Sequence, residues 1–322
     1  MSSSLGRSAR AGVAAATAAV VLGAGGYVVL RHGPDLLGSD DACGVQVDGE
    51  TTTLELDQAR NAALISAVAV RRGLPPRAVT IALATAFQES KIRNLDYGDR
   101  DSLGIFQQRP TQGWGSAAQV SDPHYATRAF YDALGDVDGY LDLPVHDAAQ
   151  EVQRSADGGA YEQHEGPARI IASALTGQAE AALTCETTDP ADSGQEVGED
   201  GLTDNARAVR ADVRRAFGTV PDGGYAPGGV STGHAEGSAH YDGRAVDFFF
   251  RPVRPALTRD GWALAQFLVA RAATLHVRTV IFDERIWTSR RSAEGWRDYE
   301  VSDSSGDQDV LLHRDHVHVD VA

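Results

Sequence analysis

Histidine and aspartate side chains are concentrated in two short segments in the second half of the chain. Residues 238–247 read SAHYDGRAVD, and residues 313–321 read HRDHVHVDV. Imidazole nitrogens and carboxylate oxygens are common zinc ligands, and a site with three protein ligands leaves a fourth position open for catalysis. A metal held in this way activates water and polarises a carbonyl group. The two segments therefore indicate hydrolytic metal chemistry.

These segments also carry a family resemblance. The first matches the pattern Ser-x-His-x-x-Gly-x-Ala-x-Asp, and the pair resembles the D-alanyl-D-alanine carboxypeptidase and murein endopeptidase families of zinc peptidases over roughly residues 203–322. In those families zinc is held by the His and Asp of the first motif and the last His of the second. The resemblance implies one zinc ion bound by His240, Asp247 and His318, with substrate-binding roles for Ser238 and His313.

Side-chain alternation supports this interpretation independently. If residues 316–321 form a strand, His316, His318 and Asp320 share one face and the intervening valines share the other. Asp247 similarly alternates with apolar neighbours in AVDFFF. We therefore expect the valines to enter the core and the histidines to face a cleft.

Two residues remain open as the general base. Some relatives place an acidic residue three positions before the last zinc-binding His, which corresponds to Asp315. The penicillin-insensitive murein endopeptidases show His-x-x-His-x-His instead, which His313, His316 and His318 match. Asp315 and His316 are therefore both candidates. His234 and Glu236 lie nearby and are interpreted as polar loop groups.

A second potential site centres on Glu89, which follows the apolar stretch IALATAF. Cleavage of a glycosidic bond needs an acid that protonates the leaving oxygen, and a carboxyl does this well when an apolar setting raises its pKa. A hydrolase normally uses a second carboxylate. Asp99 and Asp101 are available, but no pattern assigns them that role.

The segment around Glu89 resembles the lytic transglycosylases, which are lysozyme-like. Glu89-Ser90 is followed, at the family spacing, by Gly-Ile-Phe-Gln at 104–107 and by Pro110. The resemblance covers most of residues 57–180 and implies that Glu89 is catalytic, that Ser90 and Gln107 bind substrate, and that a sugar hydroxyl attacks. The stretch at 172–177, ASALTG, keeps only the glycine of the family's Tyr-Asn-Ala-Gly, which leaves retained catalysis open.

These patterns predict a multidomain fold. Residues 45–185 read as helices without a strand pattern, residues 186–200 have an acidic linker composition, and residues 201–322 mix strands with helices. We expect an all-α lysozyme-like domain followed by a small α+β zinc-peptidase-like domain, with an N-terminal transmembrane helix.

The N-terminal segment predicts export from the cytoplasm. Arg7 and Arg10 precede residues 11–30, which carry no charge and are long enough to span a bilayer. An uncleaved anchor, with residues 1–10 in the cytoplasm, is favoured over a cleaved signal peptide because no small-x-small cleavage site follows. In an exported chain a lone pair of cysteines favours a disulfide, here Cys43–Cys185.

The net charge of −16 argues against nucleic acid as a partner. The leading hypothesis is a membrane-anchored enzyme outside the cytoplasm that remodels peptidoglycan. Its first domain would cleave glycan strands, and its zinc domain would cleave stem or cross-linking peptides. The alternative is a secreted or anchored scaffold that binds peptidoglycan without cutting it. The sequence names no protein partner.

Overall fold

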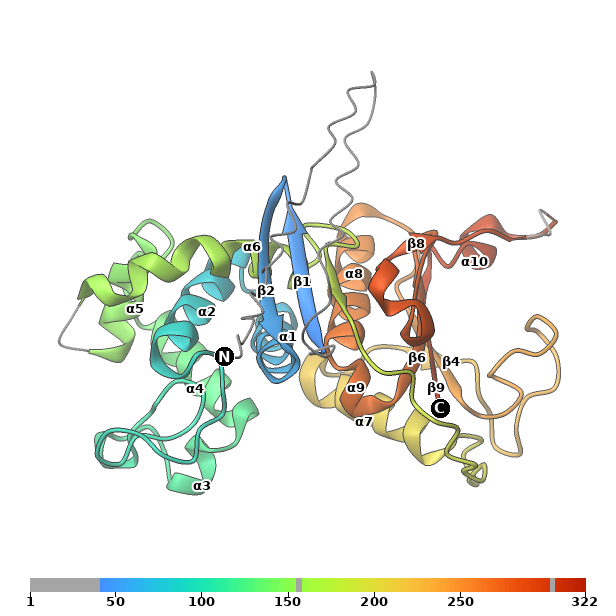
Figure 1. Ribbon diagram of the computed structural model, residues 1–322, viewed down its shortest axis with the longest axis horizontal. Coiled ribbons are helices and arrows are strands. Elements are labelled where there is room, and N and C mark those ends of the chain that lie inside the picture. Colours follow the sequence, from blue (N-terminus) through green and yellow to red (C-terminus); the bar gives the residue numbers. More distant parts are fainter. Residues whose placement is uncertain (1–40, 155–157, 302–304) are drawn as a thin grey trace, which may run out of the picture. The chain divides into compact units, whose positions relative to one another are not determined.

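The computed structural model describes residues 41–154, 158–301 and 305–322, which belong to one compact unit, 41–322 (Figure 1). The predicted membrane span, residues 11–30, lies outside the described residues. Within the described part of the chain, no helix is both long enough and apolar enough to cross a membrane.

The first half of this unit contains a sheet as well as helices. Its elements are β1 (Ala42–Val47), β2 (Glu50–Glu55), α1 (Leu56–Arg71), α2 (Pro76–Ser90), η1 (Pro110–Gln112), α3 (Ala117–Val120), α4 (Pro123–Gly135), α5 (Val145–Gln153), η2 (Gly158–His164), α6 (Glu165–Leu175) and β3 (Leu183–Cys185). The strands form an antiparallel sheet in the order β2-β1-β3. The expectation of an all-α region is therefore wrong.

The missed strands have a physical explanation. β1 and β2 are short, and their buried residues are few, so apolar alternation along them is weak. The sequence feature that does indicate this hairpin is the turn between the two strands. Asp48 and Gly49 both have positive φ, 51° and 82°, as a two-residue hairpin requires.

The predicted disulfide is confirmed. Cys43 in β1 lies directly opposite Cys185 in β3, and the two are bonded across the sheet. The bond joins residues 142 positions apart and thereby closes the whole first half of the described chain into one loop.

The second half is built on an antiparallel six-stranded sheet in the order β4-β5-β9-β6-β7-β8. Its elements are α7 (Asp204–Phe217), β4 (Asp222–Gly223), β5 (Ala245–Phe249), α8 (Pro255–Ala270), α9 (Ala272–Leu275), β6 (Val277–Phe282), β7 (Arg285–Thr288), η3 (Ser289–Glu294), β8 (Arg297–Asp298), α10 (Gln308–Leu311) and β9 (His316–Val321). The predicted linker, residues 186–200, carries no helix or strand. It is nevertheless anchored, because the Arg278 guanidinium donates to the Pro190 carbonyl and the Ser193 hydroxyl donates to the Ala322 carbonyl.

The two halves share one hydrophobic core, so the expected separation into two domains is also wrong. The shared element is α8, which contacts β6 and β9 of its own half and α1, α6 and β3 of the other (Figure 1). Every residue from Gly261 to Ala270 is buried. A helix segment that is apolar on every face must be buried on every face. Here elements of both halves pack against it.

Gln266 joins the halves at the centre of α8. Its side chain is fully buried, and its carbonyl oxygen accepts from the backbone amides of Ala182 (2.9 Å) and Leu183 (2.7 Å). Its amide nitrogen donates to the carbonyls of Ala174 (2.7 Å) and Ala179 (3.0 Å). One side chain thus satisfies four backbone groups of the first half.

Gln266→Leu should destabilise the whole unit. The substitution keeps the volume but leaves buried amides and carbonyls without partners, at about 1–3 kcal/mol for each group that stays unsatisfied. We expect the free energy of unfolding in urea to fall by about 3 kcal/mol or more, in one cooperative transition. The control Gln163→Leu, at an exposed position, should change it by less than about 0.5 kcal/mol. Equal stability of the two variants would contradict this role.

Candidate metal site and carboxylate site

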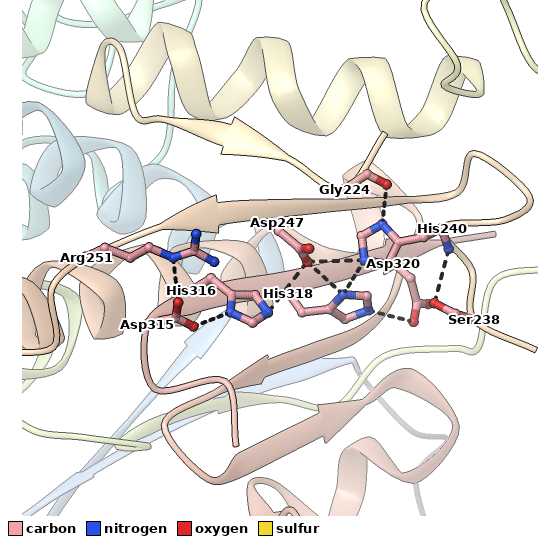
Figure 2. A network of polar contacts seen from close by, with 9 residues as sticks. All are labelled: Gly224, Ser238, His240, Asp247, Arg251, Asp315, His316, His318 and Asp320. Carbon is pink, nitrogen blue, oxygen red and sulfur yellow. Dashed lines mark hydrogen bonds and ion pairs between the residues drawn. The ribbon is translucent and has the colours of Figure 1, made fainter. Parts of the chain in front are cut away.

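Asp247 is the centre of the polar cluster in the second half (Figure 2). It lies in β5 directly opposite His318 in β9. Its Oδ1 atom is 3.2 Å from Nε2 of His240 and 3.1 Å from Nδ1 of His318, and the two nitrogens are 3.1 Å apart. Ligands of a tetrahedral zinc ion with bonds of about 2.0–2.1 Å are about 3.3 Å apart. The three atoms therefore form a triangle of the size that a bound metal ion requires.

A hydrogen bond on the far side of His240 and a longer ionic contact on the far side of His318 orient these two rings. Nδ1 of His240 is 2.7 Å from the Gly224 carbonyl oxygen. Because a carbonyl can only accept, Nδ1 carries a proton, and Nε2 is the ring nitrogen that faces Asp247 and would bind a metal. Nε2 of His318 faces the Asp320 carboxylate at 3.6 Å, which leaves Nδ1 for the cluster. Such outer partners are typical of metal-binding histidines.

The path of the chain beside His240 depends on Gly224, whose φ is +82°. A Cβ atom there would lie 2.3 Å from Cε1 of His240 and 2.9 Å from Oδ2 of Asp247. Any other residue would therefore displace the ring or the carboxylate.

Asp247 and His318 stabilise each other in the charged form. Burial tends to raise the pKa of Asp247, but hydrogen bonds from His240 and His318 outweigh it and hold that pKa well below its ordinary value. Burial tends to lower the pKa of His318, yet its contacts with Asp247 and Asp320 raise that pKa to about 9. Two facing ring nitrogens repel each other unless a proton or a metal ion lies between them. The site thus favours a cation, and metal binding must displace a proton.

A further histidine lies within reach of the same position. The ligand atoms of His234, His240 and Asp247 all lie within 4.8 Å of one another, and the His234 ring stacks on His240 with centroids 3.9 Å apart. The group that could hold a metal ion therefore contains His240 and Asp247 with either His234 or His318 as the third ligand. His318 makes the shorter contacts and is more deeply buried.

Asp315 and His316 occupy different places beside this cluster. The Asp315 carboxylate accepts from Nδ1 of His316 at 2.6 Å through Oδ1 and from the Arg251 guanidinium through Oδ2 (Figure 2). Nε2 of His316 is 3.9 Å from Oδ1 of Asp247. Both carboxylate oxygens of Asp315 are therefore engaged, whereas His316 presents its second nitrogen to the cluster.

His313 and Ser238 complete the surroundings. The His313 ring lies 4.6 Å from that of His316, between centroids, and packs on Tyr299. Burial, followed by the neighbouring histidine charges, lowers the pKa of His313 to about 3, so the ring is neutral. The Ser238 hydroxyl accepts from the His240 amide at 3.4 Å, which shapes the loop that presents His240.

Glu89 lies at the end of α2 in a partly buried setting. Burial is the largest effect on its pKa and raises it, against hydrogen bonds from Tyr161 and Gln153. The Tyr161 hydroxyl donates to Oε1 of Glu89 at 2.8 Å, and Gln153 also donates to the Phe106 carbonyl. Neither partner is predictable from the sequence, since both are more than sixty residues away along the chain and belong to no pattern.

The residues expected to bind substrate near Glu89 hold the following loop in place. Ser90 is buried, and its hydroxyl donates to the Ile105 carbonyl at 2.6 Å. The Gln107 amide donates to the carbonyls of Gly104 (3.1 Å) and Tyr97 (3.3 Å).

The Asp101 carboxylate makes its hydrogen bonds within its own loop. It accepts from the Thr111 hydroxyl (2.7 Å) and amide (2.9 Å) and pairs with Arg109. The hydrogen bonds to Thr111 and then Arg109 hold its pKa well below the ordinary value. Asp99 is largely exposed beside Arg100. Neither carboxylate makes a described contact with Glu89.

Comparison with known protein families matches residues 198–310 to the family described as VldE, C-terminal domain. The match includes His240 and Asp247 and ends before His313. No curated protein matches the chain.

Proposed function

We propose that this chain is a zinc-dependent peptidase of the bacterial cell wall. The observation that carries the proposal is the triangle formed by His240, Asp247 and His318, with both histidines oriented from behind. Two imidazoles and one carboxylate with an open fourth position are the ligand set of a catalytic zinc site. The resemblance of both motifs to zinc D-alanyl-D-alanine peptidases adds the substrate class, which is the peptide part of peptidoglycan.

A zinc ion bound here would supply Lewis-acid activation of water and of the scissile carbonyl. His316 is the residue that moves protons. Its Nδ1 proton is held by Asp315, so Nε2 accepts the proton of the attacking water. As the C–N bond breaks, the same nitrogen returns that proton to the leaving amine. Arg251 holds Asp315 and so positions His316.

We further propose that Glu89 acts on the glycan strands of the same polymer. The support is that burial raises its pKa, which is the direction that an acid catalyst needs, together with the lytic-transglycosylase-like spacing around it. Peptidoglycan offers glycan and peptide bonds side by side. The disulfide fits an oxidising compartment outside the cytoplasm, and membrane attachment through residues 11–30 remains a prediction.

The alternative from a different class is a scaffold that binds peptidoglycan through one or both sites without cutting it. Its support is the poor match of residues 172–177 to the transglycosylase pattern. Gly177 is explained by packing instead, because a Cβ there would lie 1.9 Å from the Arg259 carbonyl oxygen in α8. The two hypotheses differ in the products they predict from purified peptidoglycan.

The first test is the ligand set. We expect one zinc ion per chain by metal analysis, with binding that weakens at acidic pH as the imidazoles take up protons. His318→Ala should weaken zinc binding at least tenfold, whereas His234→Ala should leave it nearly unchanged. The reverse result would assign His234 as the third ligand. Full zinc binding by His240→Ala and by Asp247→Ala, with their fold verified by circular dichroism, would refute a site centred on these two residues.

The second test concerns His316. His316→Ala should retain zinc but lose about 10²–10⁴-fold in the rate of peptide cleavage, measured by mass spectrometry of products from peptidoglycan fragments. Asp315→Asn should lose less, because it only misorients the ring. His146→Ala, a histidine in α5, is the matched control and should cleave at the rate of the unmodified protein. A larger loss for Asp315→Asn would make Asp315 the base.

The third test concerns Glu89. Glu89→Gln should reduce glycan cleavage by at least about 10²-fold while folding and glycan binding persist. Glu162→Gln, an exposed neighbour of Tyr161, should have no effect. In the unmodified protein, cleavage should fall as pH rises through the raised pKa of Glu89, because the acid form is lost. If the unmodified protein and Glu89→Gln bind purified glycan strands equally and neither cuts them, the scaffold alternative holds for this site.

A further inference from the structure

A second hollow lies in the same sheet, beside the metal site. It encloses about 300 Å³, and four arginines line it: Arg278, Arg290, Arg291 and Arg297. The chain as a whole is acidic, with 45 Asp and Glu against 29 Lys and Arg. Four arginines around one hollow therefore form a local excess of positive charge in an acidic chain.

Two of these arginines form no ion pair among the described residues, although Glu294 lies near enough to Arg297 for that charge to lower the pKa of the Glu294 carboxyl. Arg278 donates to the Pro190 carbonyl and Arg297 to the Thr288 hydroxyl, which are neutral acceptors. In each of them the Nε atom is buried and has no hydrogen-bond partner in the described structure. Leaving a guanidinium charge without a counter-charge is costly, so an anion that binds to the terminal nitrogens of these groups would stabilise both.

The other charges of the hollow are already paired. Arg291 forms an ion pair with Glu294, and the largely exposed Arg290 lies 3.6 Å from Asp189. Asp189 also accepts from the Ser289 hydroxyl, and Asp320, the remaining carboxylate of the lining, faces His318. The unpaired positive charge therefore belongs to Arg278 and Arg297.

The sheet register connects the hollow to the metal site. Directly opposed residues of antiparallel strands share a face, and Asp247, His318, Ile281, Ile286 and Arg297 follow one another across β5, β9, β6, β7 and β8. The metal cluster and Arg297 thus lie on the same face of the sheet, in one row.

The adjacent row explains the rest of the lining. Asp320, Thr279 and Thr288 are in register, and all three line the hollow. The register of β6 shifts between Val277 and Thr279, so Arg278 is an extra residue in the strand. Such a bulge redirects a side chain, and it allows the consecutive residues Arg278 and Thr279 to line the same hollow.

Strand spacing gives the distance between the two sites. With strands about 4.8 Å apart and a rise of about 3.4 Å per residue, the hollow extends from roughly 7 Å from His318, at Asp320, to roughly 14 Å, at Arg297. This separation corresponds to about two to four residues of an extended peptide.

We propose that this arginine hollow binds an oxyanion, a carboxylate or phosphate group of the ligand, two to four residues away from the bond held at the metal site. Guanidinium groups recognise both kinds of oxyanion through paired hydrogen bonds. The assignment of an oxyanion rests on the arginines alone. The statement that one ligand spans both sites rests on the proposed peptidase function.

Calorimetry on the zinc-loaded protein tests the proposal. The probes are inorganic phosphate and an acetylated, amidated alanine tetrapeptide with one glutamate, compared with the same peptide carrying glutamine. We expect phosphate and the glutamate peptide to bind saturably, to compete with each other and to weaken as salt is added. The glutamine peptide should bind at least tenfold more weakly. Tighter binding of phosphate than of the glutamate peptide would identify a phosphoryl group as the natural ligand.

Variants locate the site. Arg278→Gln and Arg297→Gln should each weaken phosphate and glutamate-peptide binding about tenfold or more, since a hydrogen bond to a charged group is lost. The exposed Arg290→Gln cannot disturb the core and should weaken binding by a smaller factor. The control Arg169→Gln, paired with Glu50 in the first half, should bind like the unmodified protein.

The outcomes separate this inference from the proposed function. Saturable binding that depends on Arg278 and Arg297 supports an oxyanion site even if no peptide is cut. If His318→Ala leaves phosphate binding intact but weakens the glutamate peptide, the same ligand uses both sites. Absence of saturable binding, or unchanged affinity in folded Arg278→Gln and Arg297→Gln proteins, would overturn the proposal whether or not the protein cleaves peptidoglycan.

Discussion

The buried carboxylate of Asp247 is the constraint on which the second half of the structure depends. An isolated carboxylate at this depth would be strongly disfavoured, and two imidazoles from different segments compensate for it. His318 reaches it because β5 and β9 pair in a register that sets the two residues opposite each other. His240 reaches it because Gly224 leaves room beside its ring. The outer contacts to Asp320 and the Gly224 carbonyl then fix which nitrogen of each ring faces inward.

The buried part of α8, Gly261–Ala270, imposes a second constraint, on the relation between the two sites. Its apolar surface is covered on one side by β6 and β9, which belong to the metal-site sheet, and on the other by helices of the half that carries Glu89. Gln266 adds a specific set of hydrogen bonds to this packing. The metal cluster and Glu89 are thus parts of one compact unit and are held by a common core.

Features with a local periodic signal were predicted from the sequence. The alternation of histidine and valine predicted the strand at His316–Val321 and the face on which its histidines lie, and the two cysteines predicted the disulfide. Features that depend on distant contacts were not predicted. Tyr161 and Gln153 meet Glu89, and Arg251 meets Asp315, only after folding. The two-domain interpretation failed because composition separated the halves at residues 186–200, whereas the core that joins them lies inside α8.

The shared helix has a consequence for how such a chain can change over evolutionary time. Independent domains can be exchanged or lost because each buries its own apolar surface. Here, removal of the first half would expose one side of α8 and leave the buried Gln266 amide without its backbone partners, and removal of the second half would expose α1, α6 and β3. Each half therefore needs the other to keep its apolar surface buried, so both must be retained together, although their motifs resemble those of separate enzymes.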